Sequence, residues 1–282
     1  MLKKFVYFCV MAFLRHLFDF YINASIHVAL SVYAITRITE IYFDLPYDQN
    51  LDAFIFFGTI TGYNFIKYAG VAKFYHMSLT KSMRLIQIFS FLCFCLLIYF
   101  GWQISLNTLL YFSPLGLLTA LYIVPFLGGF QKNLREVSYL KIFIVAGVWS
   151  GVTSTVPLLA NGYEIDSNVV LHFAQRTLFI LALILPFEIR DVQLDLKDVR
   201  TLPQKIGVNQ TKRFGFALLL FALTLEFLIT NSNGLRNTFL LTCFLLLMLL
   251  MRAKEEQSKY YSSFWVESLP IVWWVILFIF LK

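Results

Sequence analysis

Charged residues are scarce in this 282-residue chain. They make up 14% of it, whereas hydrophobic residues make up 59%. A soluble domain carries about 25% charged residues and about 45–50% apolar ones. The mean hydropathy of +0.73 points the same way. The shortage of charge therefore excludes a single water-soluble core, and lipid must solvate much of the surface.

The apolar runs lack the period-two alternation of membrane β-strands, because they are long and continuous. Backbone that crosses a membrane must be helical or belong to a closed barrel. The sequence therefore predicts an all-α integral membrane protein. Cysteine is also rare, and every cysteine lies in an apolar stretch: Cys9, Cys93, Cys95 and Cys243. They are interpreted as small hydrophobic residues rather than as a zinc or disulfide framework.

A helical span needs about 20 mainly apolar residues. About nine runs qualify, at residues 20–42, 51–70, 85–103, 108–127, 140–160, 169–188, 213–231, 235–252 and 264–281. Residues 1–19 resemble a signal peptide but lack its small-residue cleavage site, and they are predicted to form an interfacial helix. No soluble domain fits anywhere, so 1–282 is predicted to be one transmembrane domain.

Basic residues are distributed unevenly between the two sides that these spans define. With the N-terminus inside, all 23 Lys and Arg fall in the inner segments except Arg37, Arg176, Arg236 and Lys282. Inner loops of membrane proteins are enriched in Lys and Arg. The bias predicts a cytoplasmic N-terminus and an outer C-terminus, and it explains the net charge of +7 without nucleic acid. A prokaryotic plasma membrane is the expected location.

The segment after the sixth run, PFEIRDVQLDLKDVRTLPQKIG at 186–207, is unusually polar. At about 100° per residue, its four acids fall within about 80° of one helical face: Glu188, Asp191, Asp195 and Asp198. Such a stack repels itself unless a cation sits on it. Carboxylates without His or Cys favour a hard cation such as Mg²⁺, which completes its shell with water and phosphates. Alternatively, this is a solvated loop whose acids pair with its own bases.

The same segment resembles the second aspartate-rich motif of the UbiA-type intramembrane prenyltransferases, D-x-x-D-x-x-x-D followed by T-L-P and Gly. Glu188, Asp191 and Asp195 occupy the acidic positions, and residues 201–203 and Gly207 follow. Glu188 departs conservatively from the pattern, and the gap is about one residue short. The resemblance implies about nine helices bundled around a central cavity. It also implies Mg²⁺ on the acidic motifs, with Asp191 and Asp195 as catalytic residues and Glu188 as a further metal ligand.

The first acidic motif of that family, N-D-x-x-D-x-x-x-D, is degenerate in this chain. Residues 64–74 read NFIKYAGVAKF, so Asn64 is kept, whereas Phe65, Tyr68 and Ala72 stand where the aspartates would be. Lys67 and Lys73 lie in the same stretch, and two fixed cations there could contact a diphosphate in place of a metal. They are equally explained as ordinary inner-side lysines.

Further basic residues are candidates for the rest of a diphosphate site. They follow the fourth run or accompany the second acidic motif: Lys132, Arg135, Lys141, Arg190, Lys197, Arg200 and Lys205. Topology alone explains those after the fourth run about as well. Arg176 lies within the sixth run, where a buried arginine needs a partner such as a carbonyl or a tyrosine unless it snorkels outward.

The expected function is transfer of an isoprenyl group from an isoprenyl diphosphate to a hydrophobic aromatic or lipid acceptor, with Mg²⁺ as cofactor. The missing first motif keeps a second reading open, a non-catalytic relative that binds isoprenoid or lipid. A transporter of an anionic substrate is a third, although the paired broken helices typical of many transporters are not visible.

Overall fold

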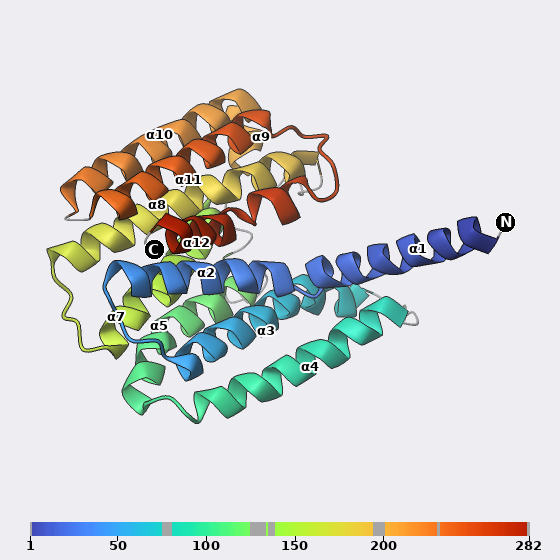
Figure 1. The fold of residues 1–282 in the computed structure, drawn as a ribbon, viewed down its shortest axis with the longest axis horizontal. Coiled ribbons are helices and arrows are strands. Elements are labelled where there is room, and N and C mark those ends of the chain that lie inside the picture. The colour runs from blue at the N-terminus through green and yellow to red at the C-terminus, as the bar shows by residue number, and fades with distance from the viewer. Residues whose placement is uncertain are drawn as a thin grey trace.

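The structure is a computed structural model that describes residues 2–74, 81–124, 134, 139–193, 201–229 and 232–280. The described part is helical, and Figure 1 shows its helices as one bundle from which the N-terminal helix α1 projects. The long elements are α1 (Leu2–Asn23), α2 (Ile26–Tyr42), α3 (Gln49–Phe74), α4 (Lys81–Gly101), α5 (Leu106–Ile123), α8 (Ser167–Arg190), α10 (Val208–Leu228) and α11 (Asn233–Arg252).

Two further apolar segments are helices interrupted by a π-turn. One consists of α6 (Leu140–Ser150), η2 (Gly151–Thr155) and α7 (Val156–Ala160), and the other of η5 (Tyr261–Val266) and α12 (Leu269–Phe280). The remaining short elements are η3 (Asp191–Gln193) and α9 (Leu202–Ile206). π-Turns inside helices occur frequently at functional sites, and both of these adjoin the site described below.

Polar caps separate the apolar helices. The Ser105 side chain accepts a hydrogen bond from the Thr108 backbone at the start of α5, and Asp166 does the same for Val169 at the start of α8. Gly207, at φ +82°, divides α9 from α10. The Ser105 and Asp166 caps each satisfy a backbone donor that a helix start leaves free, so they help to define where α5 and α8 begin.

The predicted all-α membrane class is confirmed, and the helices match the predicted apolar runs within a few residues in most cases. Within the described residues, six helices are long and apolar enough to cross a membrane, and the bent pair α1–α2 would add a seventh. Helices α3 and α10 have 26 and 21 residues but carry more polar groups. The count of nine spans and the orientation of the termini remain predictions.

The first run differs from its predicted bounds of 20–42. Helix α1 continues to Asn23, and the chain then bends by 55° before α2 begins at Ile26. The physical cause lies in Ser25, whose φ of +61° places it in the left-handed region that a continuing α-helix excludes. We call residues Asn23–Ser25 the elbow. The interfacial position of residues 1–19 stays a prediction.

The core joins the helices through neighbouring pairs. Helix α2 packs against α3 and α12, α8 packs against α6 and α10, and α11 packs against α10 and α12. The face of α4 and α5 that carries Phe91, Leu92 and Leu110 is exposed. Exposed apolar side chains are what a lipid-facing surface requires. The opposite faces of α4 and α5 point toward the other helices and help to form the interior.

Candidate functional site

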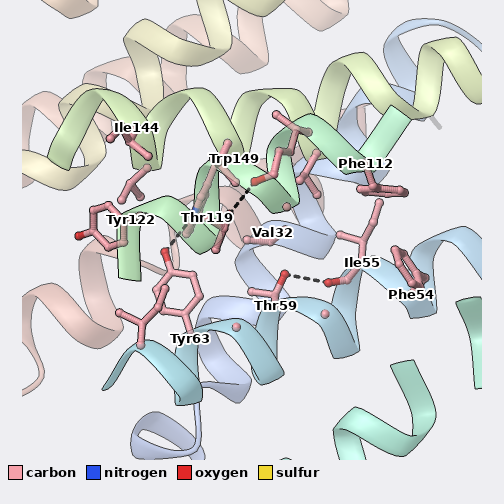
Figure 2. A pocket seen from close by; sticks show the side chains of 18 of the residues that line it. Val32, Phe54, Ile55, Thr59, Tyr63, Phe112, Thr119, Tyr122, Ile144 and Trp149 are labelled. Atoms are coloured by element: carbon pink, nitrogen blue, oxygen red, sulfur yellow. Dashed lines mark hydrogen bonds between the residues drawn. The ribbon is translucent and has the colours of Figure 1, made fainter. Parts of the chain in front are cut away.

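An apolar cavity of about 390 Å³ lies between α2, α3, α4, α5 and the α6–η2 segment. Figure 2 shows Tyr63 and Tyr122 at one end of it and Phe54 and Phe112 at the other. The Trp149 indole donates a hydrogen bond of 2.8 Å to the Tyr63 hydroxyl. The volume and the apolar lining are those of a small-ligand pocket, and its polar end is marked by the two tyrosines.

Directly after Tyr63 on α3, side chains of the degenerate first motif bind the elbow. Asn64 Nδ2 donates to the Ala24 carbonyl at 3.0 Å, Lys67 Nζ to Ser25 Oγ at 3.0 Å, and the Tyr68 hydroxyl to the Asn23 carbonyl at 3.0 Å. Three side chains of this motif thus bind three successive elbow residues. Asn64 is buried and also donates to Ser90 Oγ at 2.8 Å, so its role in this structure is to join helices.

The last apolar segment places a carboxylate at the same end. Glu267 follows the π-turn η5, and its backbone carbonyl accepts a hydrogen bond from Ser31. Its side chain is half-buried and interacts electrostatically with Lys67 of α3 and Arg190 of α8. It also lies close enough to Tyr63 to interact with that phenol. Glu267 therefore belongs to the same electrostatic neighbourhood as the two cations and the Tyr63 phenol.

The second motif begins at the end of α8 with two acid–base pairs. Lys141 Nζ lies 3.0 Å from Glu188 Oε1. Arg190 binds Asp191 through two hydrogen bonds, Nε to Oδ1 at 2.7 Å and Nη2 to Oδ2 at 3.0 Å. We call the described charged groups gathered here the charged end: Lys67, Lys141, Glu188, Arg190, Asp191 and Glu267. Three bases and three acids make it neutral in sum.

The predicted site residues thus separate into groups. Lys67 and Arg190 both interact electrostatically with Glu267, and Lys141 forms an ion pair with Glu188. Asn64 is turned toward the elbow. Lys205 of α9 lies over the Tyr139 ring. The other predicted residues lie outside the described residues, or, for Lys73, outside the described side chains: Lys73, Lys132, Arg135, Asp195, Lys197, Asp198 and Arg200.

The charged end fits a Mg²⁺ ion that is shared with a substrate, rather than one held by protein ligands alone. Within the described residues, no group of three His, Cys, Asp or Glu side chains could hold a metal ion. Glu188 and Asp191 are one turn apart at the end of α8, and Mg²⁺ often binds through one or two carboxylates while substrate phosphates complete its shell. The residues therefore fit an ion shared with a diphosphate. The opposite wall offers Lys67 rather than a second acidic motif.

Sequence reasoning missed Glu267, although a signal for it exists. It is the one acid within 264–281, a run that otherwise reads as an apolar span. An ionisable residue inside a span is costly, and it usually faces the bundle interior. That rule alone nominates Glu267, but it says nothing of Lys67 and Arg190, because their proximity to it depends on how three distant helices pack.

Comparison with known proteins identifies the fold. No protein-family model and no curated protein sequence matches the chain. Among solved structures, a UbiA homologue from Archaeoglobus fulgidus bound to DMAPP and Mg²⁺ is similar with a TM-score of 0.60 and 11% identity, over 93% of this chain and 98% of that one.

Two further structures agree. A UbiA homologue from Aeropyrum pernix K1 is similar with a TM-score of 0.58 and 12% identity, over 91% of this chain and 96% of that one. A digeranylgeranylglyceryl phosphate synthase is similar with a TM-score of 0.54 and 16% identity, over 94% and 97%. The chain is a multi-pass integral membrane protein with the fold of the UbiA-type prenyltransferases, as its second acidic motif predicted.

Proposed function

We propose that this protein is an intramembrane prenyltransferase, which binds an isoprenyl diphosphate and transfers its prenyl group to a hydrophobic aromatic or lipid acceptor. The observation that carries the proposal is that the polar end of the apolar cavity and the charged end are neighbours along α3. Tyr63 lines the cavity, and Lys67 follows one turn later on the same helix. An amphipathic donor with an apolar tail and an anionic head needs this arrangement.

The chemistry follows from the charges. As the bond between C1 and the diphosphate breaks, negative charge accumulates on the departing group, and the fixed cations Lys67 and Arg190 stabilise it. The apolar cavity holds the tail and keeps water from the reacting carbon. Mg²⁺ bound with the diphosphate at Asp191, and at Asp195 beyond the described residues, would supply further charge neutralisation.

A second candidate function has its own observation. Asn64 and Tyr68 of the degenerate first motif hold the elbow, and no acid faces the site from α3 at that motif. A non-catalytic protein that binds an isoprenoid or lipid needs the cavity but not that motif. The two functions differ in turnover, so binding and transfer must be measured separately.

The test begins with the full chain in detergent. Calorimetry measures binding of farnesyl and geranylgeranyl diphosphate with Mg²⁺ and with EDTA, for the wild type, Lys67→Gln and Asp191→Asn. Lys254→Gln, an exposed lysine in a loop, is the matched control. A hydrogen bond to a charged group contributes about 1.5–3 kcal/mol, so Lys67→Gln should weaken binding about 10–100-fold.

Transfer is then followed with radiolabelled geranylgeranyl diphosphate, a lipid extract and phenolic acceptors. Label in a product other than the free prenyl alcohol supports the prenyltransferase. Donor binding without such a product supports the non-catalytic function. If neither donor binds with or without Mg²⁺, both candidate functions are contradicted, because both assume a prenyl tail in the cavity and a diphosphate at Lys67 and Arg190.

A further inference from the structure

We propose that Glu267 is the catalytic base of the site, the group that takes the proton of the incoming acceptor. The inference rests on the proposed prenyl transfer. In that step the acceptor's nucleophilic atom forms a bond to C1, and the bond between C1 and the diphosphate oxygen breaks. Its electron pair leaves with the diphosphate, and the proton on the acceptor atom passes to the Glu267 carboxylate.

Position is the first argument. The diphosphate is expected at Lys67 and Arg190 and the prenyl tail in the cavity beyond Tyr63, so C1 lies between them. The backbone carbonyl of Glu267 is held by Ser31 of α2, whose neighbour Val32 lines the cavity, and the Glu267 carboxylate interacts electrostatically with Lys67, Arg190 and Tyr63. A base must come within hydrogen-bond reach of the proton it removes, and in the proposed step the acceptor lies between this carboxylate and C1.

Availability is the second argument. The other acids described at the charged end already hold protein cations at 3.0 Å or less, Glu188 with Lys141 and Asp191 with Arg190. Glu267 is half-buried, and among the described residues it makes no direct ion pair. Its carboxylate is therefore open to a ligand, although helices surround it.

The neighbouring histidine does not compete for this role. His27 is buried, its Nδ1 is 2.6 Å from the Tyr21 hydroxyl, and its Nε2 is 3.1 Å from both the Phe264 carbonyl and Ser268 Oγ. Both ring nitrogens are thus engaged, Nδ1 with α1 and Nε2 with the last apolar segment. No ring nitrogen remains to accept a proton from a substrate.

Rigidity is the third argument. The carbonyl of Glu267 is held by Ser31, and Val266 and Leu269 on either side are buried in the core. A catalytic group acts best from a rigid element whose position is fixed by packing. Because the first motif has no acids, α3 offers no carboxylate there, and Glu267 in the turn between η5 and α12 supplies one from another element.

The alternative is that Glu267 only balances the charges of Lys67 and Arg190. The two roles predict different kinetics. A base contributes about 10²–10⁴-fold to the chemical step, so Glu267→Gln should lower kcat at least about 100-fold while the affinity for geranylgeranyl diphosphate stays within about threefold. A purely balancing carboxylate would alter donor affinity and leave kcat largely unchanged.

The experiment measures transfer of label from geranylgeranyl diphosphate, donor binding by calorimetry and thermal unfolding for the wild type, Glu267→Gln and Glu267→Asp. Glu267→Asp should retain partial turnover. The rising limb of the wild-type profile of kcat against pH should disappear in Glu267→Gln. The titratable and charged groups near Glu267 are Tyr21 of α1, His27 of α2, Tyr63 and Lys67 of α3, and Arg190 of α8.

Each outcome decides the proposal. If Glu267→Gln transfers label at more than a third of the wild-type rate, or loses donor binding, Glu267 is not the base and the proposed transferase stands. If the wild type transfers no label to any acceptor, the proposed function fails and the inference fails with it. Should Glu267→Gln not fold, Glu267→Asp carries the test, and an undiminished kcat in that variant overturns the role.

Discussion

Arg176 is a buried arginine in the half of the bundle away from the charged end. Its side chain is 1% exposed, and its guanidinium carbon lies 4.2 Å from the Trp273 ring centroid and 5.1 Å from that of Tyr42. Glu226, which is fully buried, attracts it electrostatically and accepts a hydrogen bond of 2.5 Å from Gln175. Rings and a carboxylate thus replace the water that this charge has lost.

This arrangement predicts an asymmetric response to substitution. Arg176→Met leaves the buried Glu226 without its countercharge and should lower the free energy of unfolding by about 3–5 kcal/mol. Adding Glu226→Gln removes that charge too, so the double variant should regain most of the loss. Thermal and SDS unfolding in detergent measure both, with the exposed Arg252→Met as control. A double variant as unstable as Arg176→Met would show that the pair does not act through charge.

At the residue scale, the sequence was informative about chemistry and silent about partners. The acids after the sixth span and Lys67 could be nominated from the printed letters alone. Their partners could not, since Lys141 reaches Glu188 across 47 positions and Lys67 meets Glu267 across 200. Such pairs depend on which helices pack together, and one sequence carries no direct record of that.

Helices, by contrast, were largely predictable as elements. Apolar runs of about 20 residues form helices in lipid because no other partner exists for their backbone groups. The elbow was not predictable, because Ser25 has no special preference for positive φ and is held there by the chain around it. Nor were the π-turns η2 and η5, because they respond to tertiary packing rather than to local propensity.

Helix packing yields a paired prediction at two glycines. A Cβ at Gly215 of α10 would lie 2.8 Å from Leu185 Cδ1 and press on Leu250, and both leucines are fully buried. A Cβ at Gly151 of η2 would lie 2.7 Å from Leu115 Cδ2, but Leu115 lines the cavity and can move into it. Overpacking a closed core typically costs about 1–3 kcal/mol.

The free energy of unfolding of Gly215→Ala should therefore be about 1–3 kcal/mol lower than that of Gly151→Ala. The gain in helix propensity is similar for both variants and does not affect the comparison. Gly151→Ala should instead weaken binding of farnesyl diphosphate, because Leu115 takes up cavity space. Thermal unfolding and calorimetry on the same preparations check the two effects. Equal unfolding midpoints for the two variants would mean that α8, α10 and α11 are not packed as closely as the structure has them.

At the scale of the whole molecule, the two ends of the bundle differ in charge. The corner between α2 and α3 is acidic. Asp44 and Asp48 lie in the turn, and Asp52 at the start of α3 lies near Arg37, which also pairs with Glu40. The described ends of α3, α8 and α11 and the starts of α4 and α6 carry the bases. Because the positive-inside rule counts Lys and Arg near span ends, this asymmetry sets the expected orientation, with the charged end facing the cytoplasm.

The orientation decides from which side a water-soluble head group enters, and labelling of single cysteines in the full chain tests it. We replace the native cysteines and introduce Pro46→Cys in the α2–α3 turn or Lys254→Cys after α11, both at exposed positions. In intact bacterial cells, an impermeant maleimide should label Cys at 46 and reach Cys at 254 only after the membrane is opened. The reverse pattern would place the charged end outside, where a diphosphate made in the cytoplasm could not reach Lys67 and Arg190. Labelling of both positions in intact cells would mean that the number of spans between them is even rather than the predicted odd number.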